Sequence, residues 1–446
     1  MTRRPEPLAA LRISTALYRF RESLFALPTL VVVGGVILAE TTAFLDHLVG
    51  VDSPLPFTVQ MNSNGATWLL STVAGATITT AGVVFSLTVV SLQLASSQFS
   101  PRVLRSFIRD RVSQFVIGLL VATFVFCVLV LRHISGDTTS NAPQISMTVA
   151  IVLAVATVLL IIAYLNRLAH GLQVGEVVRT IAAEAEAVIA ATACQAHDDR
   201  PHAPSSIDIP DDRLSVRAQR DGWVTQAPSR FILDAVPPST VVRLETRTGA
   251  YIHRGEVLMT LWPVPDQPAK VQTALLSTVE IADVRTMQQD IDFGIRQLVD
   301  VALRALSSAI NDPTTATEVV LRLGSLLRIL LASDLPPASV AGIDGRVLLR
   351  PWDLSHDEYI EHAFDQIRQT GTTQPHVVTA LLRVLRMLID HSRDVGREQH
   401  IPALRSQVRR LMETMAVQPQ LHPADLARLQ TLAQERGVDP AEHDAE

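Results

Sequence analysis

Polar side chains recur at a fixed interval in one long apolar stretch near the N-terminal end of this sequence. Thr72, Thr79, Ser86, Gln93 and Ser100 follow one another seven residues apart. On a helix, a seven-residue period keeps side chains on one narrow strip that faces a partner. Hydroxyl and amide groups on such a strip can hydrogen-bond to a neighbouring helix or to water.

Two interpretations of this strip are open. Gly75, Gly82 and Ser96 each follow a member of the series by three residues, and small residues let membrane helices approach closely. In the first interpretation the strip is therefore an ordinary packing interface. In the second, several copies of the helix surround an axis and present uncharged rings of Thr, Ser and Gln to a water-filled pore. The arginines that follow Pro101 then favour anions at its mouth.

A second candidate group lies in the polar C-terminal half and consists of Asp290, Asp292, Arg296, Asn311, Asp312 and Thr314. Asp312 before Pro313 is typical of a helix start, with Asp312 as the N-cap and Pro313 as the first helical residue. The other oxygen-bearing side chains suit a hard cation such as Ca²⁺ or Mg²⁺. Alternatively, the free N–H groups at the helix start suit an anion.

Charged residues of alternating sign follow one another four residues apart in this half: Asp292, Arg296, Asp300 and Arg304. Such pairs contribute only ~0.2–0.5 kcal/mol each on a helix surface. We therefore expect a solvated row of ion pairs along one face of a helix.

The common catalytic and cofactor-binding motifs are absent from the sequence: HExxH, the Walker phosphate loop, GxGxxG and G-x-S-x-G. Cys127 and Cys194 cannot form a disulfide framework or a CxxC metal site. A net charge of −6 argues against nucleic acid as a partner. We therefore expect no enzymatic activity, cofactor, bound metal or nucleic-acid partner.

Four apolar stretches occupy the first third of the chain: Leu24–Leu45, Thr67–Leu94, Phe115–Leu131 and Ile145–Tyr164. Each is near or above the ~20 residues that a helix needs to cross a bilayer. Because only structures that satisfy their own backbone hydrogen bonds survive in lipid, the sequence predicts an α-helical membrane protein with four transmembrane helices, in contact with the lipid bilayer.

Arginines near the ends of these stretches fall on alternating sides. They cluster in residues 3–21 and 102–111, whereas residues 49–63 have no basic side chain and the third connection has only Arg132. Cytoplasmic loops carry an excess of Lys and Arg. We therefore expect a multi-pass protein of the bacterial cytoplasmic (inner) membrane with both termini in the cytoplasm.

Beyond the fourth stretch, helical spacing continues through Asn166–Ala193, and a proline-dotted linker follows at Gln195–Asp212. From Leu214 to about Val284, short alternating runs predict strands. The run Thr248–Leu258 resembles a barrel-sandwich hybrid, the small β fold of lipoyl carriers and membrane-fusion adaptors. A carrier domain needs a modifiable lysine at the tip of a hairpin, and Lys270 lies outside this pattern. We therefore expect a structural β module and no carrier domain.

The rest of the chain is predicted to be mainly helical, with a short β excursion near Val347–Leu349. The first predicted helix is the one that carries Asp292 and Arg304. The helices predicted after it are Pro313–Leu331, His356–Thr370, His376–His391, Pro402–Met415 and Pro423–Glu435. The expected cytoplasmic part is thus an α+β domain, with a small β-barrel-sandwich-like module and a helical bundle. The expected boundaries are 1–165 for the four-helix transmembrane domain, 166–197 for a helical extension, 198–284 for the linker and β module, and 285–446 for the helical domain.

Three segments carry a resemblance to a known family: Ser91–Arg102 (SLQLASSQFSPR), Asp292–Asp300 (DFGIRQLVD) and Ile310–Ala316 (INDPTTA). Together they resemble the bacterial predicted membrane proteins catalogued as domain of unknown function 2254, from the first span to about Arg393. Ser308 stands where that family often has Pro before the Ala-Ile-Asn-Asp-Pro run. The resemblance implies a topology, and it supplies no catalytic residues.

Three classes of function remain for a protein with these features. The interpretation we favour is an oligomeric channel or permease, a homo-oligomer whose second span lines the path and whose cytoplasmic part forms a vestibule or gate. The alternative is a membrane-anchored scaffold or sensor whose cytoplasmic domain binds a partner or small ligand. A membrane enzyme ranks last, because the sequence offers no nucleophile, acid–base pair or metal set.

Overall fold

The computed structural model describes residues 25–49, 58–98, 111–134, 142–171, 173–201, 209–417 and 422–435. The chain divides into two compact units; the first ends at Glu176, and most of the second follows from Val177. We call them the membrane unit and the C-terminal unit. Ser100 and the predicted flanking arginines in residues 3–21 and 102–109 lie outside the described residues.

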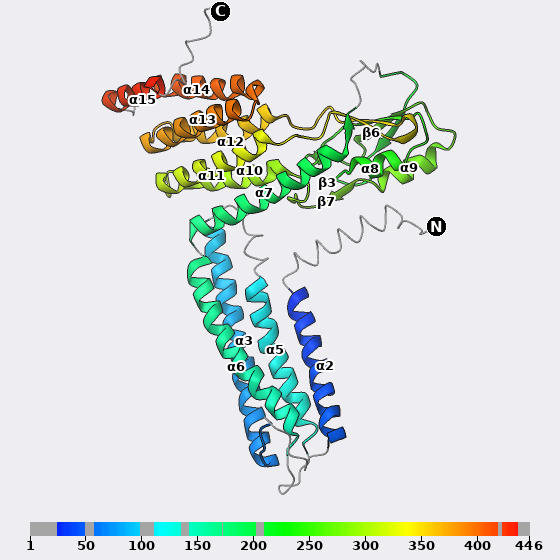
Figure 1. Ribbon diagram of the computed structural model, residues 1–446, viewed down its shortest axis with the longest axis vertical. Helices are drawn as coiled ribbons and strands as arrows, with labels where there is room; N and C mark the ends of the chain where they lie inside the picture. Colours follow the sequence, from blue (N-terminus) through cyan, green and yellow to red (C-terminus); the bar gives the residue numbers. More distant parts are fainter. Residues whose placement is uncertain are drawn as a thin grey trace, which may run out of the picture. The chain divides into compact units, whose positions relative to one another are not determined.

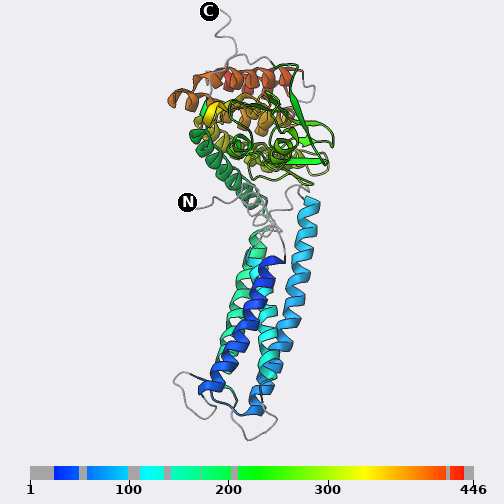
Figure 2. The same ribbon diagram turned by 90° about the vertical axis from the view of Figure 1, so that its right-hand side faces the viewer.

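Within the described residues, four helices make up the membrane unit and run side by side (Figures 1 and 2). They are α2 (Ala26–Val49), α3 (Ser63–Gln98), α5 (Arg111–Leu131) and α6 (Gln144–Gly171). Each is long and apolar enough to cross a bilayer. The prediction of four transmembrane helices is confirmed at this level.

α5 is the most buried helix of the membrane unit and packs against α2, α3 and α6. Its approach to α2 depends on glycine. A Cβ atom on Gly118 would lie 2.9 Å from Pro28 Cα, and one on Gly35 would lie 2.9 Å from Ala122 Cβ. Small residues thus let these two backbones come close, which is how helices commonly associate in lipid.

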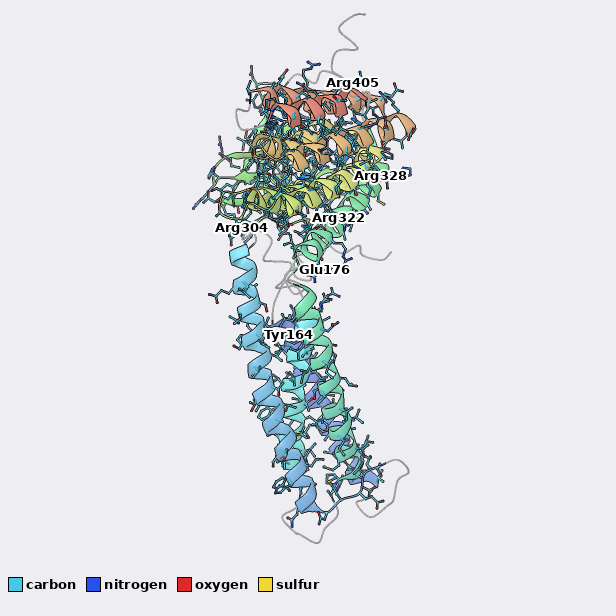
Figure 3. The ribbon with its side chains drawn as sticks, turned by 90° about the vertical axis from the view of Figure 1, so that its left-hand side faces the viewer. Tyr164, Glu176, Arg304, Arg322, Arg328 and Arg405 are labelled. Atoms are coloured by element: carbon cyan, nitrogen blue, oxygen red, sulfur yellow. The ribbon has the colours of Figure 1, made fainter. Side chains whose placement is uncertain are left out.

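Two sets of polar contacts join the helices of the membrane unit. The buried hydroxyl of Tyr164 on α6 (Figure 3) lies 2.8 Å from Thr88 Oγ1 on α3. The buried carboxylate of Asp46, near the end of α2, accepts hydrogen bonds from Ile145 N at 2.8 Å and from Ser146 N at 2.9 Å. Asp46 therefore caps the N-terminus of α6 from a different helix.

The helix predicted to continue from the fourth span is divided in the structure. α6 ends at Gly171, and α7 (Val174–Asp198) is a separate helix. Glycine disfavours helix interiors because it loses more backbone entropy than other residues, which accounts for the end of α6 at this position.

Two sheets form the β part of the C-terminal unit. The larger has the order β1-β8-β9-β4-β6-β2 and the smaller has the order β5-β3-β7. The strands are β1 (Arg200–Pro201), β2 (Leu214–Arg217), β3 (Gly222–Gln226), β4 (Val241–Leu244), β5 (Tyr251–Ile252), β6 (Val257–Trp262), β7 (Glu280–Ala282), β8 (Ser339–Ala341) and β9 (Val347–Leu349). Both sheets share one hydrophobic core with the short helices α8 (Ser229–Asp234) and α9 (Pro268–Leu276).

The predicted strand at Val347–Leu349 is confirmed as β9. It is more than an excursion between helices, because it pairs in parallel with β4 and antiparallel with β8 inside the larger sheet. Residues 339–349, which come late in the sequence, therefore form part of the larger sheet.

A helical bundle forms the rest of the C-terminal unit (Figure 1). Its helices are α10 (Ile291–Ala305), α11 (Pro313–Ala332), α12 (His356–Gly371), α13 (Pro375–Asp394), α14 (Ile401–Ala416) and α15 (Pro423–Glu435). The predicted helices are confirmed, with ends that move by a few residues at most. Three of these helices begin with a side-chain cap: Asp290 for α10, Asp312 for α11, and a capping box of Ser355 and Glu358 for α12.

Candidate functional site

The predicted strip on α3 points away from the other helices of the membrane unit. We call Thr72, Thr79, Ser86 and Gln93 the α3 seam, and all four are exposed. Among the described side chains of α3, those that are buried are Ser63, Ala66, Leu70, Ala74, Thr77, Ala81 and Val84. Because successive helical residues are about 100° apart, these buried residues lie on nearly the opposite side of α3 from the seam.

The seam is polar, uncharged and unobstructed in the described chain. Thr72 Oγ1 donates to Trp68 O and Thr79 Oγ1 donates to Gly75 O, both at 2.8 Å. Each hydroxyl thereby donates its proton within the helix, and its lone pairs can still accept a hydrogen bond from water. A Cβ atom added to Gly75 or Gly82 would meet nothing within 4 Å, so these glycines leave open space beside the seam.

The second candidate group contains a buried ion cluster at the start of α10. We use that name for Arg285, Asp290, Asp292, Arg296 and His362. Arg285 Nε and Nη2 donate to the two carboxylate oxygens of Asp290 at 2.6 and 3.0 Å, and Nη2 also donates to Asp292 Oδ2 at 2.8 Å. His362 Nδ1 on α12 lies 2.7 Å from Asp292 Oδ1, and Arg296 Nε lies 3.5 Å from the same oxygen.

Burial gives these contacts their strength. Asp292 is only 2 % exposed, and the Arg285 guanidinium lies 5.5 Å from the ring centre of Trp223 and 5.3 Å from that of Phe293. Burial alone raises the pKa of Asp292, but the hydrogen bonds from His362 and Arg285 outweigh burial and hold that pKa well below its ordinary value. Asp292 is therefore a carboxylate at neutral pH.

Gly249 allows the cluster to pack against the β part. Its φ of +81° lies in the left-handed region, and a Cβ atom on it would overlap Asp290 Oδ2 and its carboxyl carbon. The loop between β4 and β5 therefore needs glycine here both for its backbone conformation and for its contact with Asp290.

The expectation of a solvated row of ion pairs is wrong for its first member. Asp292 is buried because α12 covers it through His362 and because the segment before α10 folds back with Arg285. Four-residue spacing identified the helix face, but it carried no information about the elements that cover that face.

The structure separates the six residues of the second candidate group. Asp290, Asp292 and Arg296 lie at the start of α10, whereas Asn311, Asp312 and Thr314 follow its end. A 15-residue helix places these ends roughly 22 Å apart. The two halves therefore do not converge on one ion.

Asp312 acts as the predicted helix cap. Its carboxylate accepts from Thr315 N at 3.1 Å and from Thr315 Oγ1 at 2.6 Å, and Pro313 opens α11. These hydrogen bonds lower the pKa of Asp312. Asn311 adopts a positive φ of 49° and accepts a hydrogen bond from Gln374 at 3.3 Å, while Thr314 is exposed. This half of the group is accounted for by its turn and cap.

Sequence reasoning missed Arg285 and His362. His362 stands six positions after His356 on α12, and no local spacing connects it to Asp292, 70 positions away. Among the described residues, no group of three or more His, Cys, Asp or Glu side chains has the arrangement of a metal site.

Comparisons with known proteins place this architecture among uncharacterised relatives. Residues 21–387 match a family described as "Predicted membrane protein (DUF2254)". Uncharacterized proteins of Mycobacterium tuberculosis (strain H37Rv) and Mycobacterium bovis are each 33% identical over 341 residues, which is 74% of this chain and 64% of theirs. The chain thus spans less than two thirds of the length of these relatives. No solved structure matches it.

Proposed function

The chain belongs to the DUF2254 family of predicted membrane proteins, and on this premise we propose that it is an oligomeric channel or permease of the bacterial inner membrane. Several copies assemble with their α3 seams toward a common axis. The observation that carries the proposal is the exposure of the whole seam on the side of α3 that faces away from α2, α5 and α6.

The length and chemistry of α3 suit a path across the bilayer. Its 36 residues span roughly 54 Å, well beyond the ~30 Å hydrocarbon core. Rings of hydroxyl and amide groups from several copies pass hydrated ions with little selectivity. The arginines at residues 102, 105 and 109 follow α3 in the sequence and favour anions at the cytoplasmic mouth.

The arginine distribution supports an arrangement with both termini and the C-terminal unit in the cytoplasm. The two sheets that share one core support a barrel-sandwich-like module with a structural role. In the proposed arrangement the C-terminal unit forms the vestibule or gate of the path. The protein acts as a homo-oligomer and catalyses no reaction.

Ion flux into proteoliposomes tests the proposal. Thr79→Leu replaces a seam hydroxyl, and Thr80→Leu makes the same change one residue later, off the seam. The two threonines are matched, because each donates to the carbonyl four residues earlier at 2.8 Å. We expect Thr79→Leu to reduce chloride flux at least severalfold and Thr80→Leu to leave it unchanged. Absence of flux in the wild type, or equal flux in both variants, contradicts the proposal.

A membrane-anchored sensor is the second candidate. The observation that favours it is the polar interior of the C-terminal unit, where the ion cluster adjoins a cavity. A flux-silent protein that binds a small ligand through that unit is the result expected for a sensor.

A further inference from the structure

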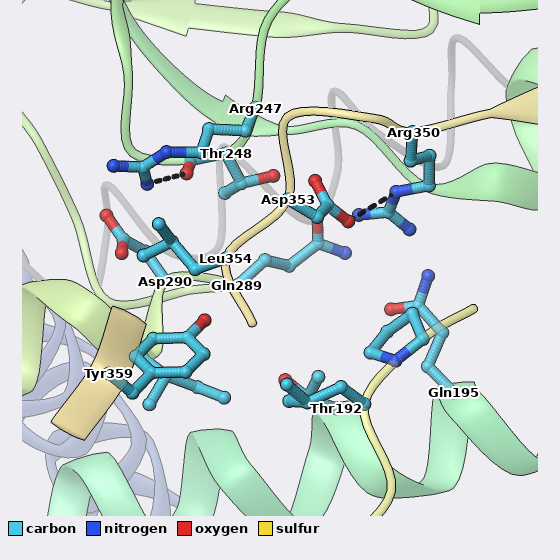
Figure 4. Close-up of a pocket in the computed structure, with 13 residues that line it drawn as sticks. Thr192, Gln195, Arg247, Thr248, Gln289, Asp290, Arg350, Asp353, Leu354 and Tyr359 are labelled. Atoms are coloured by element: carbon cyan, nitrogen blue, oxygen red, sulfur yellow. Dashed lines mark hydrogen bonds and ion pairs between the residues drawn. The ribbon is translucent and has the colours of Figure 1, made fainter. Parts of the chain in front are cut away.

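A small polar cavity lies inside the C-terminal unit, next to the ion cluster (Figure 4). Its volume is ≈ 60 Å³. α7 contributes Thr192, the β4–β5 loop contributes Arg247, and the segment before α10 contributes Gln289. Arg350 follows β9, and Tyr359 comes from α12. Side chains from five separate parts of the chain therefore converge on one small, partly open cavity.

Tyr359 directs an uncommitted hydroxyl into this space. The residue is only 9% exposed, and its hydroxyl makes no hydrogen bond to any residue that the structure describes. Burial raises the pKa of Tyr359, so the hydroxyl keeps its proton at neutral pH. A ligand in the cavity that accepts a hydrogen bond gives this hydroxyl a partner.

Two more groups offer free donors. Gln289 uses its Oε1 to accept from Ala227 N at 3.2 Å, which leaves its amide N–H groups for another acceptor. Arg247 makes one hydrogen bond, to the carbonyl of Thr248 at 3.2 Å. A guanidinium carries five N–H donors, so most of those on Arg247 are available.

The acidic groups at the cavity are already occupied. Asp353 lies 2.7 Å from Arg350 Nε, and Asp290 accepts two hydrogen bonds from Arg285 and one from Phe293 N. Arg247 has no ion pair within the described residues. The charged side chains that line the cavity are Arg247, Arg350, Asp290 and Asp353. Asp353 pairs with Arg350 and Asp290 with Arg285, so Arg247 is the one cation of this lining without an ion pair to a described residue.

We propose that this cavity is a binding site for one small free oxyanion, of the size of sulfate, phosphate or bicarbonate. A water molecule needs roughly 10–15 Å³ of such space, so a cavity of ≈ 60 Å³ holds about four to six heavy atoms, a range that includes such an ion. Arg247 supplies the compensating charge, and Tyr359 and Gln289 supply hydrogen bonds. Arginine is well suited to oxyanions because its planar fork matches their geometry.

The site joins elements that are far apart in sequence. Thr192 lies on α7, whereas Gln289 precedes α10 and Tyr359 belongs to α12. A bound anion therefore links α7 to the core of the C-terminal unit. The proposal does not depend on conduction by the membrane unit, so either can fail without the other.

Isothermal titration calorimetry on the full-length protein in detergent tests the site, with sulfate, inorganic phosphate and bicarbonate as probes and chloride as the control for ionic strength. We expect saturable binding of at least one oxyanion, with one ion per chain. Binding of sulfate and phosphate alone identifies a tetrahedral ion, and binding of bicarbonate alone identifies a planar one; both support the proposal. No saturable binding of any probe overturns it.

Two pairs of variants locate the binding. Arg247→Gln is expected to weaken binding tenfold or more and Tyr359→Phe about fivefold. Arg254→Gln and Tyr251→Phe make the same changes at exposed positions outside the cavity and should leave the affinity unchanged. Tyr359→Phe removes a single oxygen atom, so it tests the site even where Arg247→Gln fails to fold. Equal affinity in Tyr359→Phe and Tyr251→Phe contradicts the proposal.

Discussion

His362 Nδ1 lies 2.7 Å from Asp292 Oδ1, although 70 positions separate the two residues in the sequence. The contact joins α12 to the first turn of α10. Because Asp292 also binds Arg285, one buried carboxylate connects three segments of the C-terminal unit. The stability of this unit should therefore depend on the ionisation of Asp292.

Asp292→Asn tests this dependence. The pKa of Asp292 is lowered in the folded state, so its contribution is fully present above the ordinary carboxyl value of about 4 and is lost as the pH falls below it. We expect the variant to be about 3 kcal/mol less stable at pH 7. Its free energy of unfolding should also fall less steeply than that of the wild type between pH 5 and pH 3.

Tryptophan fluorescence during chemical unfolding measures both quantities, since Trp223 lies beside Arg285. Asp344→Asn is a matched control, because Asp344 is exposed and its positive φ of 58° suits Asn as well as Asp. Parallel pH profiles for Asp292→Asn and the wild type would show that the cluster contributes no pH-dependent stability.

Gly249→Ala is expected to destabilise the C-terminal unit by clearly more than Gly255→Ala. Both glycines have positive φ, +81° and +90°, so both variants carry backbone strain of ~1–2 kcal/mol. Only at Gly249 does the new Cβ atom overlap Asp290; at Gly255 it meets nothing within 4 Å. We expect an additional loss of about 2 kcal/mol for Gly249→Ala in the same unfolding assay. Equal losses would mean that the contact with Asp290 relaxes freely.

Asp46→Ala should weaken the membrane unit. The change removes the acceptor for Ile145 N, Ser146 N and Ser146 Oγ at the start of α6, and loss of a helix cap costs about 1–2 kcal/mol. Asp46→Asn keeps one acceptor oxygen, so its stability should be intermediate between that of the wild type and that of Asp46→Ala. Glu40→Ala is the control, because Glu40 is half exposed and lies 3.5 Å from the exposed Arg132, a pair worth little.

Unfolding of the protein in mixed micelles of increasing SDS fraction ranks these variants by their stability. An Asp46→Ala protein that is as stable as Glu40→Ala would show that the cap on α6 is dispensable.

Much of the fold was readable from the sequence because its signals are local. The four spans are long apolar runs, and the adjacent residues Asp312 and Pro313 mark the start of α11. The helix ends of the bundle were likewise close to the observed ones. In each case neighbouring residues alone determine the signal.

The interior of the C-terminal unit was not readable for the opposite reason. Burial of Asp292 depends on α12 and on Arg285, and the cavity combines side chains from α7 to α12. The α3 seam could be predicted only in part. Its seven-residue period was visible in the sequence, but only the packing of α5 and α6 against α3 shows that it faces outward.

Disulfide cross-linking tests whether α3 seams of different copies face one another. The background is Cys127→Ala with Cys194→Ser, since these are the free cysteines. Ser86→Cys on the seam should give covalent dimers on mild oxidation in native membranes. Phe85→Cys, at an exposed position about 100° away on the helix, should not. Dimers from Phe85→Cys and none from Ser86→Cys would place a different face of α3 at the contact between copies.

The water accessibility of position 79 tests directly whether the seam lines an aqueous path. In the same cysteine-free background, Thr79→Cys and Thr80→Cys are exposed in membranes to a small charged thiol reagent. We expect rapid modification at position 79, because the seam lines an aqueous path, and slow modification at position 80. Protection of position 79 to the same degree as position 80 would contradict this expectation, because the seam would then lie against lipid or protein and no water would reach it.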